Sequence, residues 1–88
     1  MRFVPSQIIP AYSWVACFKH NKDEVAKIPI VCWALGTEYH EGKSVIENQI
    51  HGMIPSGGDI VSAKTSDNFI EYEVSVPEIE MEVDDNLN

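Results

Sequence analysis

The chain has 88 residues, with 14 Asp or Glu against 6 Lys or Arg and a formal net charge of -8. This length suits one small domain, and a hydrophobic content of 44% is enough for a folded core. The acidic balance argues against direct binding to nucleic-acid phosphates, which clustered Lys and Arg drive, and favours a partner with a basic protein surface.

The first residues predict neither secretion nor a membrane anchor. Residues 1–6 lack the apolar run and the small-residue cleavage site of a signal peptide. No stretch approaches the roughly 20 apolar residues that span a bilayer. We therefore expect a cytoplasmic protein that does not bind membranes. Its two cysteines, Cys17 and Cys32, are expected to be reduced, and a cross-strand disulfide between them is the alternative.

Residues 1–11 are expected to form an extended N-terminal arm, because Pro5 and Pro10 each push the preceding residue towards extended backbone. The arm either lies across the core or adds a short edge strand. Residues 12–19 predict a strand, since Trp14, Ala16 and Phe18 alternate onto one face. The polar residues 20–27 predict a loop.

The longest apolar run spans residues 27–36 and predicts a central strand that is covered on both faces. A buried helix is the alternative, because part of the run also fits helical spacing. A hairpin centred near Glu24 would set Cys17 opposite Cys32. Its main core face would contain Trp14, Ala16, Phe18, Val31, Trp33 and Leu35. The opposite face of residues 28–34 would need a cover from the arm, from a helix at 44–53 or from another subunit.

Residues 44–54 are compatible with a strand or a helix. In a strand, Ile46, Ile50 and Ile54 point inward with Asn48 and Gly52, while Glu47, Gln49 and His51 point to solvent. In a helix over 44–53, Ser44 and Glu47 form a capping box. The strand is favoured because Gly52 weakens a helix and the neighbouring segments predict strands.

The remaining segments predict further strands and turns. Residues 55–59 and 65–68 indicate turns, 60–64 a short strand, and 69–76 a strand with Ile70, Tyr72, Val74 and Val76 inward. The fold class is therefore mainly β. We expect a small antiparallel sheet of about five strands over a single domain at 12–76, curling into a partly open SH3-like or OB-like barrel. An acidic tail at 77–88 follows it.

The chemical motifs are weak, so we expect no enzyme, no cofactor and no metal. Gly42-Lys43-Ser44 lacks the preceding glycine of a phosphate-binding loop. Cys17, His20, Cys32, His40 and His51 do not form the two tight pairs of a structural zinc site. No residue is assigned as catalytic, because Cys32 lies in an apolar run and no Ser or Cys has an evident base.

Three functions remain open. The first is a small acidic interaction module that binds a basic protein surface and acts as an inhibitor or regulator by charge mimicry, in the manner of small acidic phage or mobile-element proteins. The carboxylates assigned to this partner-binding surface are Glu38, Glu41, Glu71, Glu73, Glu78, Glu80 and Glu82.

The second function is a barrel that binds a small molecule or nucleotide. Its expected ligand-binding residues are Trp14, Trp33, Tyr39, Ser56, Gly57 and Gly58. The third is a structural accessory subunit of an assembly. A homo-oligomer would then form through an exposed sheet edge or through the second apolar face of 28–34.

Overall fold

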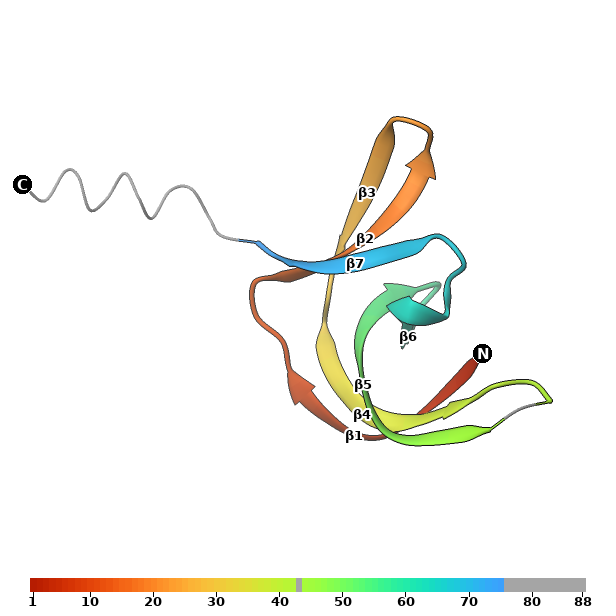
Figure 1. Cartoon of the computed structure of the whole chain (residues 1–88). Coiled ribbons are helices and arrows are strands. Elements are labelled where there is room, and N and C mark those ends of the chain that lie inside the picture. Colours follow the sequence, from red (N-terminus) through yellow and green to blue (C-terminus); the bar gives the residue numbers. More distant parts are fainter. Residues whose placement is uncertain (43, 76–88) are drawn as a thin grey trace, which may run out of the picture.

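The computed structural model describes residues 1–42 and 44–75, and this part of the chain contains seven strands and one short 3-10 helix. The strands are β1 (Arg2–Pro10), β2 (Trp14–Asn21), β3 (Glu24–Pro29), β4 (Cys32–Tyr39), β5 (Val45–Ser56), β6 (Asp59–Ser62) and β7 (Phe69–Val74), and the helix is η1 (Ala63–Thr65). They form a four-stranded sheet, β1-β4-β5-β6, and a three-stranded sheet, β3-β2-β7 (Figure 1). Every strand pair is antiparallel.

The prediction of a mainly β fold is confirmed. The two sheets do not close into a barrel, so the SH3-like or OB-like architecture stays a prediction. The expected N-terminal arm is a full edge strand, because β1 pairs with β4 from Arg2 opposite Tyr39 to Pro10 opposite Cys32. The acidic tail at 77–88 lies outside the described residues, and β7 is the last strand among those described.

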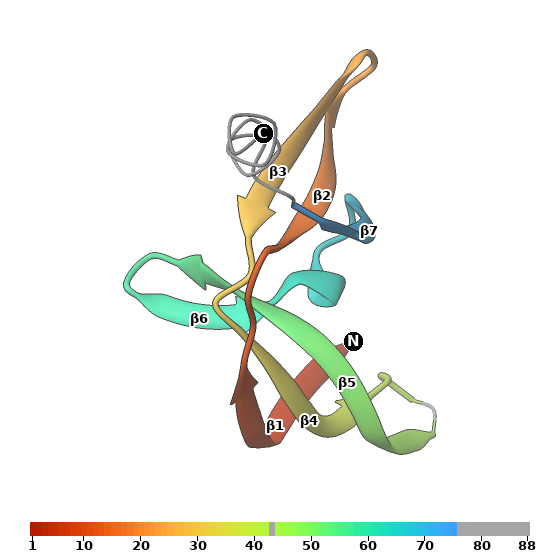
Figure 2. The same cartoon turned by 90° about the vertical axis from the view of Figure 1, so that its left-hand side faces the viewer.

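The long apolar run is divided between the two sheets, which corrects the prediction of one central strand. β3 ends at Pro29 and β4 begins at Cys32, and Ile30 and Val31 carry the chain from one sheet to the other (Figure 2). The Ile30 amide donates to the Trp14 carbonyl in the three-stranded sheet. The Val31 amide donates to the Met53 carbonyl in the four-stranded sheet, so Ile30 and Val31 connect the two sheets by backbone hydrogen bonds.

The predicted hairpin register is wrong. β2 turns back at Lys22 and Asp23, which places Cys17 opposite Lys27 and leaves both cysteines free in different sheets. Asn21 explains the tight turn, because its side-chain oxygen accepts the Asp23 amide at 3.0 Å and its amide group donates to Glu24. Most of the predicted loop at 20–27 is therefore strand.

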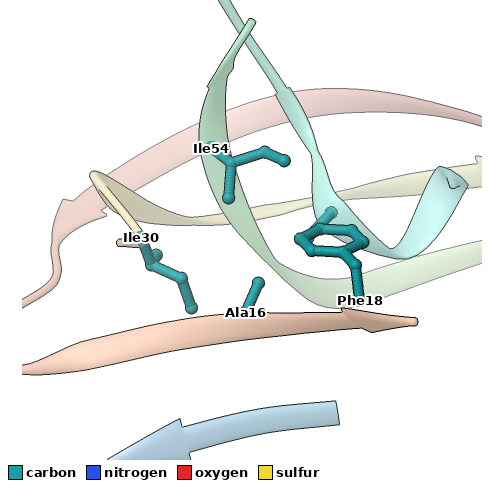
Figure 3. Packing of buried hydrophobic residues seen from close by; sticks show 5 residues of the cluster. Ala16, Phe18, Ile30 and Ile54 are labelled. Carbon is teal, nitrogen blue, oxygen red and sulfur yellow. The ribbon is translucent and has the colours of Figure 1, made fainter. Parts of the chain in front are cut away.

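The main core lies where the sheets meet. Its buried residues are Ala16, Phe18, Ile30, Ile54 and Ala63 (Figure 3). Trp33 packs edge-on against Trp14 and Tyr72, with ring centroids 5.6 and 5.0 Å apart. Ile30 was expected on the opposite face, whereas Val31, expected in this core, is 46% exposed. The break between β3 and β4 explains both errors, because the in-and-out alternation of side chains is not continuous from Ile30 to Cys32.

β5 is a strand, as favoured, and the helical alternative is wrong. Its predicted inward set is only partly right: Ile54 is buried, but Ile46 and Ile50 are exposed and His51 is fully buried. Two causes combine. The register shifts between Gly36 and Glu38, with Asn48 at φ 58°, and this bulge moves Ile46 onto the His51 face. In addition, both faces of β5 are covered at residues 51–54.

The last hairpin and β7 follow the prediction more closely. Gly57 and Gly58 adopt φ of 57° and 85° in the turn between β5 and β6, as the glycine pair indicated. On β7, Tyr72 faces the core as expected, but Ile70 and Val74 are exposed. β7 is an edge strand whose neighbour β2 shifts register at Cys17 and Phe18, and this places Phe69 rather than Ile70 against the core. Val76 lies outside the described residues.

Candidate functional site

A buried chain of three polar side chains crosses the four-stranded sheet. Glu38 of β4, His51 of β5 and Ser62 of β6 are 6%, 0% and 4% exposed. His51 Nδ1 lies 2.5 Å from Ser62 Oγ, and His51 Nε2 lies 2.6 Å from a Glu38 carboxylate oxygen. We call this arrangement the Ser–His–Glu chain.

The strand registers bring these residues together. His51 pairs with Ala34, and Glu38 lies four residues farther along β4, so both side chains project from the same face of the sheet. Ser62 pairs with Met53, two residues from His51, and therefore shares that face. The main core lies against the other face. The β4 residues Cys32, Ala34 and Gly36 that precede Glu38 on this face are small and leave room for the imidazole.

β1 covers the Ser–His–Glu chain on its remaining side. The Phe3 ring stacks on the His51 ring with centroids 3.8 Å apart and planes 9° apart. Phe3 pairs with Glu38 across β1 and β4, so the backbone register fixes this position. The imidazole is therefore held by groups from all four strands of the sheet.

The protonation states follow from burial and hydrogen bonding. Hydrogen bonds from His51 and then His40 lower the pKa of Glu38, and burial lowers the pKa of His51. At neutral pH the imidazole is neutral and the carboxylate is ionised. His51 Nε2–H then donates to Glu38, and the bare Nδ1 accepts the Ser62 hydroxyl proton in a hydrogen bond.

His40 holds the second oxygen of the Glu38 carboxylate. Its Nε2 lies 3.0 Å from Glu38 Oε1, and the imidazole is half-buried at the end of β4. Among residues 1–42 and 44–75, no buried side-chain nitrogen or oxygen lacks a hydrogen-bond partner. The chain is thus a fully satisfied polar network, which restricts each member to one orientation.

A groove of about 470 Å³ opens beside the chain. It lies between β1 and β6, which are the edges of the four-stranded sheet within the described residues. Phe3, Ile8, Met53 and Ile60 give it apolar walls, and Ser62 contributes to its lining. Ser62 therefore contacts His51 on one side and the groove on the other.

A second cluster lies on the outer face of the three-stranded sheet. One ligand-type atom from each of Cys17, Glu71 and Glu73 lies within 4.8 Å of the others. Burial and the charge of Glu73 raise the pKa of the Cys17 thiol, and Lys27 binds Glu73 at 2.7 Å. A protonated thiol beside a neutralised carboxylate is a poor metal site. The other metal candidates do not converge, since only His40 and His51 meet, at Glu38.

The carboxylates predicted to bind a partner do not form one surface as far as residues 1–42 and 44–75 are described. Glu38 is buried in the Ser–His–Glu chain, Glu41 lies in the exposed turn after β4, and Glu71 and Glu73 lie on β7. Glu78, Glu80 and Glu82 lie outside the described residues.

The predicted ligand-binding residues are also dispersed. Trp14 and Trp33 pack in the main core, and Tyr39 lies under the Arg2 guanidinium at 4.6 Å from its ring centroid. Ser56, Gly57 and Gly58 form the exposed tip of the β5–β6 hairpin. The structure thus separates this set into three places: the two tryptophans in the core, Tyr39 at the end of β4, and the tip of the β5–β6 hairpin.

An apolar patch remains uncovered on the face of the four-stranded sheet that packs against the other sheet. Gln7, Ile9, Leu35 and Ile50 lie on this face beyond the core, and Ile9 and Ile50 are 62% and 63% exposed. A shallow depression of about 60 Å³ lies between them. We call it the Ile9–Ile50 patch. It contains none of the residues singled out as partner-binding from the sequence.

Sequence reasoning missed the Ser–His–Glu chain because it placed His51 on the solvent face of its strand. One local signal was available: Glu38 follows Cys32, Ala34 and Gly36 at alternate positions, which is a face of small residues that ends in an acid. Such a face accommodates a large neighbour. Which neighbour fills it depends on strand pairing, which the pattern does not specify.

A comparison with protein families, curated proteins and solved structures finds no match to this chain. Within residues 1–42 and 44–75, no helix has the length and apolar character needed to span a bilayer.

Proposed function

We propose that the protein is an interaction module that binds another protein through the Ile9–Ile50 patch. The observation that carries this proposal is the exposure of two large aliphatic side chains, Ile9 and Ile50, on one uncovered sheet face. Contiguous exposed apolar surface on a small protein commonly marks a contact site. Leu35, half-buried between them, continues the same surface.

The charge of the chain supports a basic partner. The net charge of -8 attracts positively charged surfaces at long range, and acidic side chains such as Glu41 and Glu47 lie exposed on the same β4–β5 hairpin as Ile50. Charge mimicry by Glu41, Glu71, Glu73 and the tail acids belongs to this proposal as a steering component. Glu38 is buried and hydrogen-bonded to two histidines, so it stabilises the fold and does not contact a partner directly.

Affinity capture with matched variants tests the proposal. Ile9→Ser/Ile50→Ser removes the apolar patch, and Val25→Ser/Ile70→Ser removes two exposed aliphatic residues from the other sheet as a control. We expect a basic protein to be retained by the wild type and the control, lost with the patch variant, and released more readily as salt rises. Retention by all three proteins, or binding indifferent to salt, contradicts the proposal.

Self-association is the alternative use of the same patch. Two copies that bury it against each other would form a symmetric dimer, as expected for an accessory subunit of an assembly. Sedimentation or light scattering separates the alternatives: a dimer that Ile9→Ser/Ile50→Ser converts to monomer assigns the patch to a second copy of this chain.

A further inference from the structure

We propose that Ser62 is an activated nucleophile and that the groove between β1 and β6 is an acyl-transfer site for carboxylic esters with apolar acyl groups. The geometry combines three features. A serine hydroxyl lies 2.5 Å from an imidazole nitrogen, a carboxylate lies 2.6 Å from the other nitrogen, and the serine lines a groove of about 470 Å³. A nucleophile, its base and the group that orients the base are three of the parts that serine acyl transfer uses.

The direction of the hydrogen bonds suits this chemistry. An ionised carboxylate only accepts hydrogen bonds, so Glu38 fixes the imidazole proton on Nε2. Nδ1 of a neutral imidazole then has a free lone pair, and the Ser62 hydroxyl is the donor to it. In serine hydrolases the serine contacts the other ring nitrogen, but either nitrogen of an imidazole can take the proton.

The base is held rigidly. Phe3 stacks on one face of the His51 ring, and the β4–β5 and β5–β6 registers fix the two residues that it contacts. His40 secures the other carboxylate oxygen of Glu38 at 3.0 Å. Little reorientation of the imidazole is needed before proton transfer, which favours reaction.

The groove indicates the class of substrate. Its volume lies within the range of small-molecule sites. Phe3, Ile8, Met53 and Ile60 supply apolar walls, and Ser62 lies opposite Met53 across β5 and β6. The remaining polar lining comes from Arg2, Asp59 and Thr65. An apolar acyl group fits such walls and places its ester carbonyl towards the serine.

The reaction proceeds in two balanced steps. Ser62 Oγ attacks the ester carbonyl carbon while its proton moves to His51 Nδ1, and collapse of the tetrahedral intermediate breaks the bond to the leaving alcohol, which takes the proton from His51. Water then attacks the acyl-serine, again losing its proton to His51, and the carboxylic acid departs as Ser62 regains its proton. Glu38 is a positioning residue, because its carboxylate contacts the base and His40 and does not contact Ser62.

Covalent labelling tests the proposal on the wild-type chain. A fluorophosphonate forms a bond between Oγ and phosphorus and releases fluoride, so it marks an activated serine in the same manner as an ester. We expect one adduct per chain, mapped by peptide mass spectrometry to Ser62, and release of nitrophenol from p-nitrophenyl butyrate. No adduct on folded wild-type protein, or equal labelling of several serines, overturns the proposal.

Two substitutions complete the test. Ser62→Ala is expected to abolish the adduct and the nitrophenol release, whereas Ser66→Ala is the matched control, because Ser66 is exposed and hydrogen-bonds through its backbone within the described residues. Labelling that persists in folded Ser62→Ala contradicts the proposal. Because site mapping uses the wild type, poor folding of a variant does not affect the main result.

The pH profile separates a positioning role of Glu38 from a structural one. The groups that face His51 are Glu38 from β4, Ser62 from β6, Lys64 from η1 and the uncharged Phe3 from β1. His40, which follows β4, contacts the far oxygen of Glu38. Labelling should be insensitive to pH near neutrality and fall in acid as His51 becomes protonated. In Glu38→Gln we expect at least a 10-fold slower reaction with a displaced profile, and an unchanged rate and profile would contradict the role.

The Ile9→Ser/Ile50→Ser variant should label normally, so this inference stands independently of the partner-binding proposal.

Discussion

At the scale of single residues, His51 connects the packing of the four-stranded sheet to its buried polar network. It is fully buried, it stacks on Phe3, and it joins Glu38 to Ser62. Burying a polar ring is unfavourable unless its hydrogen bonds are made, and here both are. His51 is therefore the central residue of the candidate site and also a buried residue on which the stability of the sheet depends.

Removing the imidazole should strongly destabilise the fold. His51→Ala leaves the ionised Glu38 with fewer partners in a buried position and opens a cavity beneath Phe3. We expect the free energy of unfolding to fall by about 3 kcal/mol or more, measured by urea denaturation. In Glu38→Gln/His51→Ala the loss should be smaller than the sum of the single losses, since the buried charge is gone. Additive losses would show that the two groups are not coupled.

Acid should destabilise the protein in two stages. The folded-state pKa of His51 is lowered by burial, so the unfolded chain binds the proton first, and stability is lost as pH falls below about 6.5. The folded-state pKa of Glu38 is lowered by its hydrogen bonds from His51 and His40, so a second loss begins below about 4.3 and continues towards the folded value. Thermal unfolding measured from neutral pH down to about pH 2 should show both, and Glu38→Gln should remove the second contribution. Stability that rises on acidification would contradict these directions.

At the scale of elements, β1 and β4 approach too closely for any side chain at Gly36. A Cβ there would meet the Val4 carbonyl oxygen, and would lie 2.7 Å from the Phe3 ring and 2.8 Å from Pro5 Cα. Two of these neighbours are backbone atoms of the paired strand, so they can move only by disturbing the β1–β4 register. The same close approach brings Phe3 onto His51.

Gly36→Ala should therefore loosen β1. We expect a loss of about 1–3 kcal/mol in the free energy of unfolding, together with faster amide hydrogen exchange along Arg2–Pro10. Gly42→Asn is the control, because Gly42 has open space around it and a φ of 64° that Asn tolerates. A change as small as the control's would mean that β1 shifts without cost.

The sequence predicted which segments are extended far better than which segments pair. Alternation and β-branched residues identified most strands, and Gly57-Gly58 identified a turn. The pairing depended on two details that local pattern does not reveal: the Asn21 side chain that closes a two-residue turn, and the switch of sheets at Ile30 and Val31. Once that register was misplaced, the core face and the burial of His51 were misplaced with it.

At the scale of the whole molecule, the two sheets share one core and leave other surfaces open. Trp33 and Gly52 of the four-stranded sheet meet Tyr72 of the other, and the Gly52 amide donates to the Tyr72 hydroxyl at 2.8 Å. A Cβ at Gly52 would lie 2.7 Å from the Tyr72 ring, so a glycine is required for this approach. Beyond this contact the four-stranded sheet exposes the Ile9–Ile50 patch on the same face, and the groove opens on the other.

Because the core is shared, the two sheets should unfold together, and Tyr72→Phe should lower the stability of both. Losing the hydroxyl leaves the Gly52 amide without its acceptor, at an expected cost of about 1–2 kcal/mol. Tryptophan fluorescence reports the contact between the sheets through Trp14 and Trp33, and far-ultraviolet circular dichroism reports all strands. We expect the two urea transitions to coincide in the wild type and to shift by the same amount in Tyr72→Phe. Tyr12→Phe, at an exposed position, should leave both transitions in place. Separated transitions would show that each sheet folds on its own core, and the Gly52–Tyr72 contact would then join two independent units.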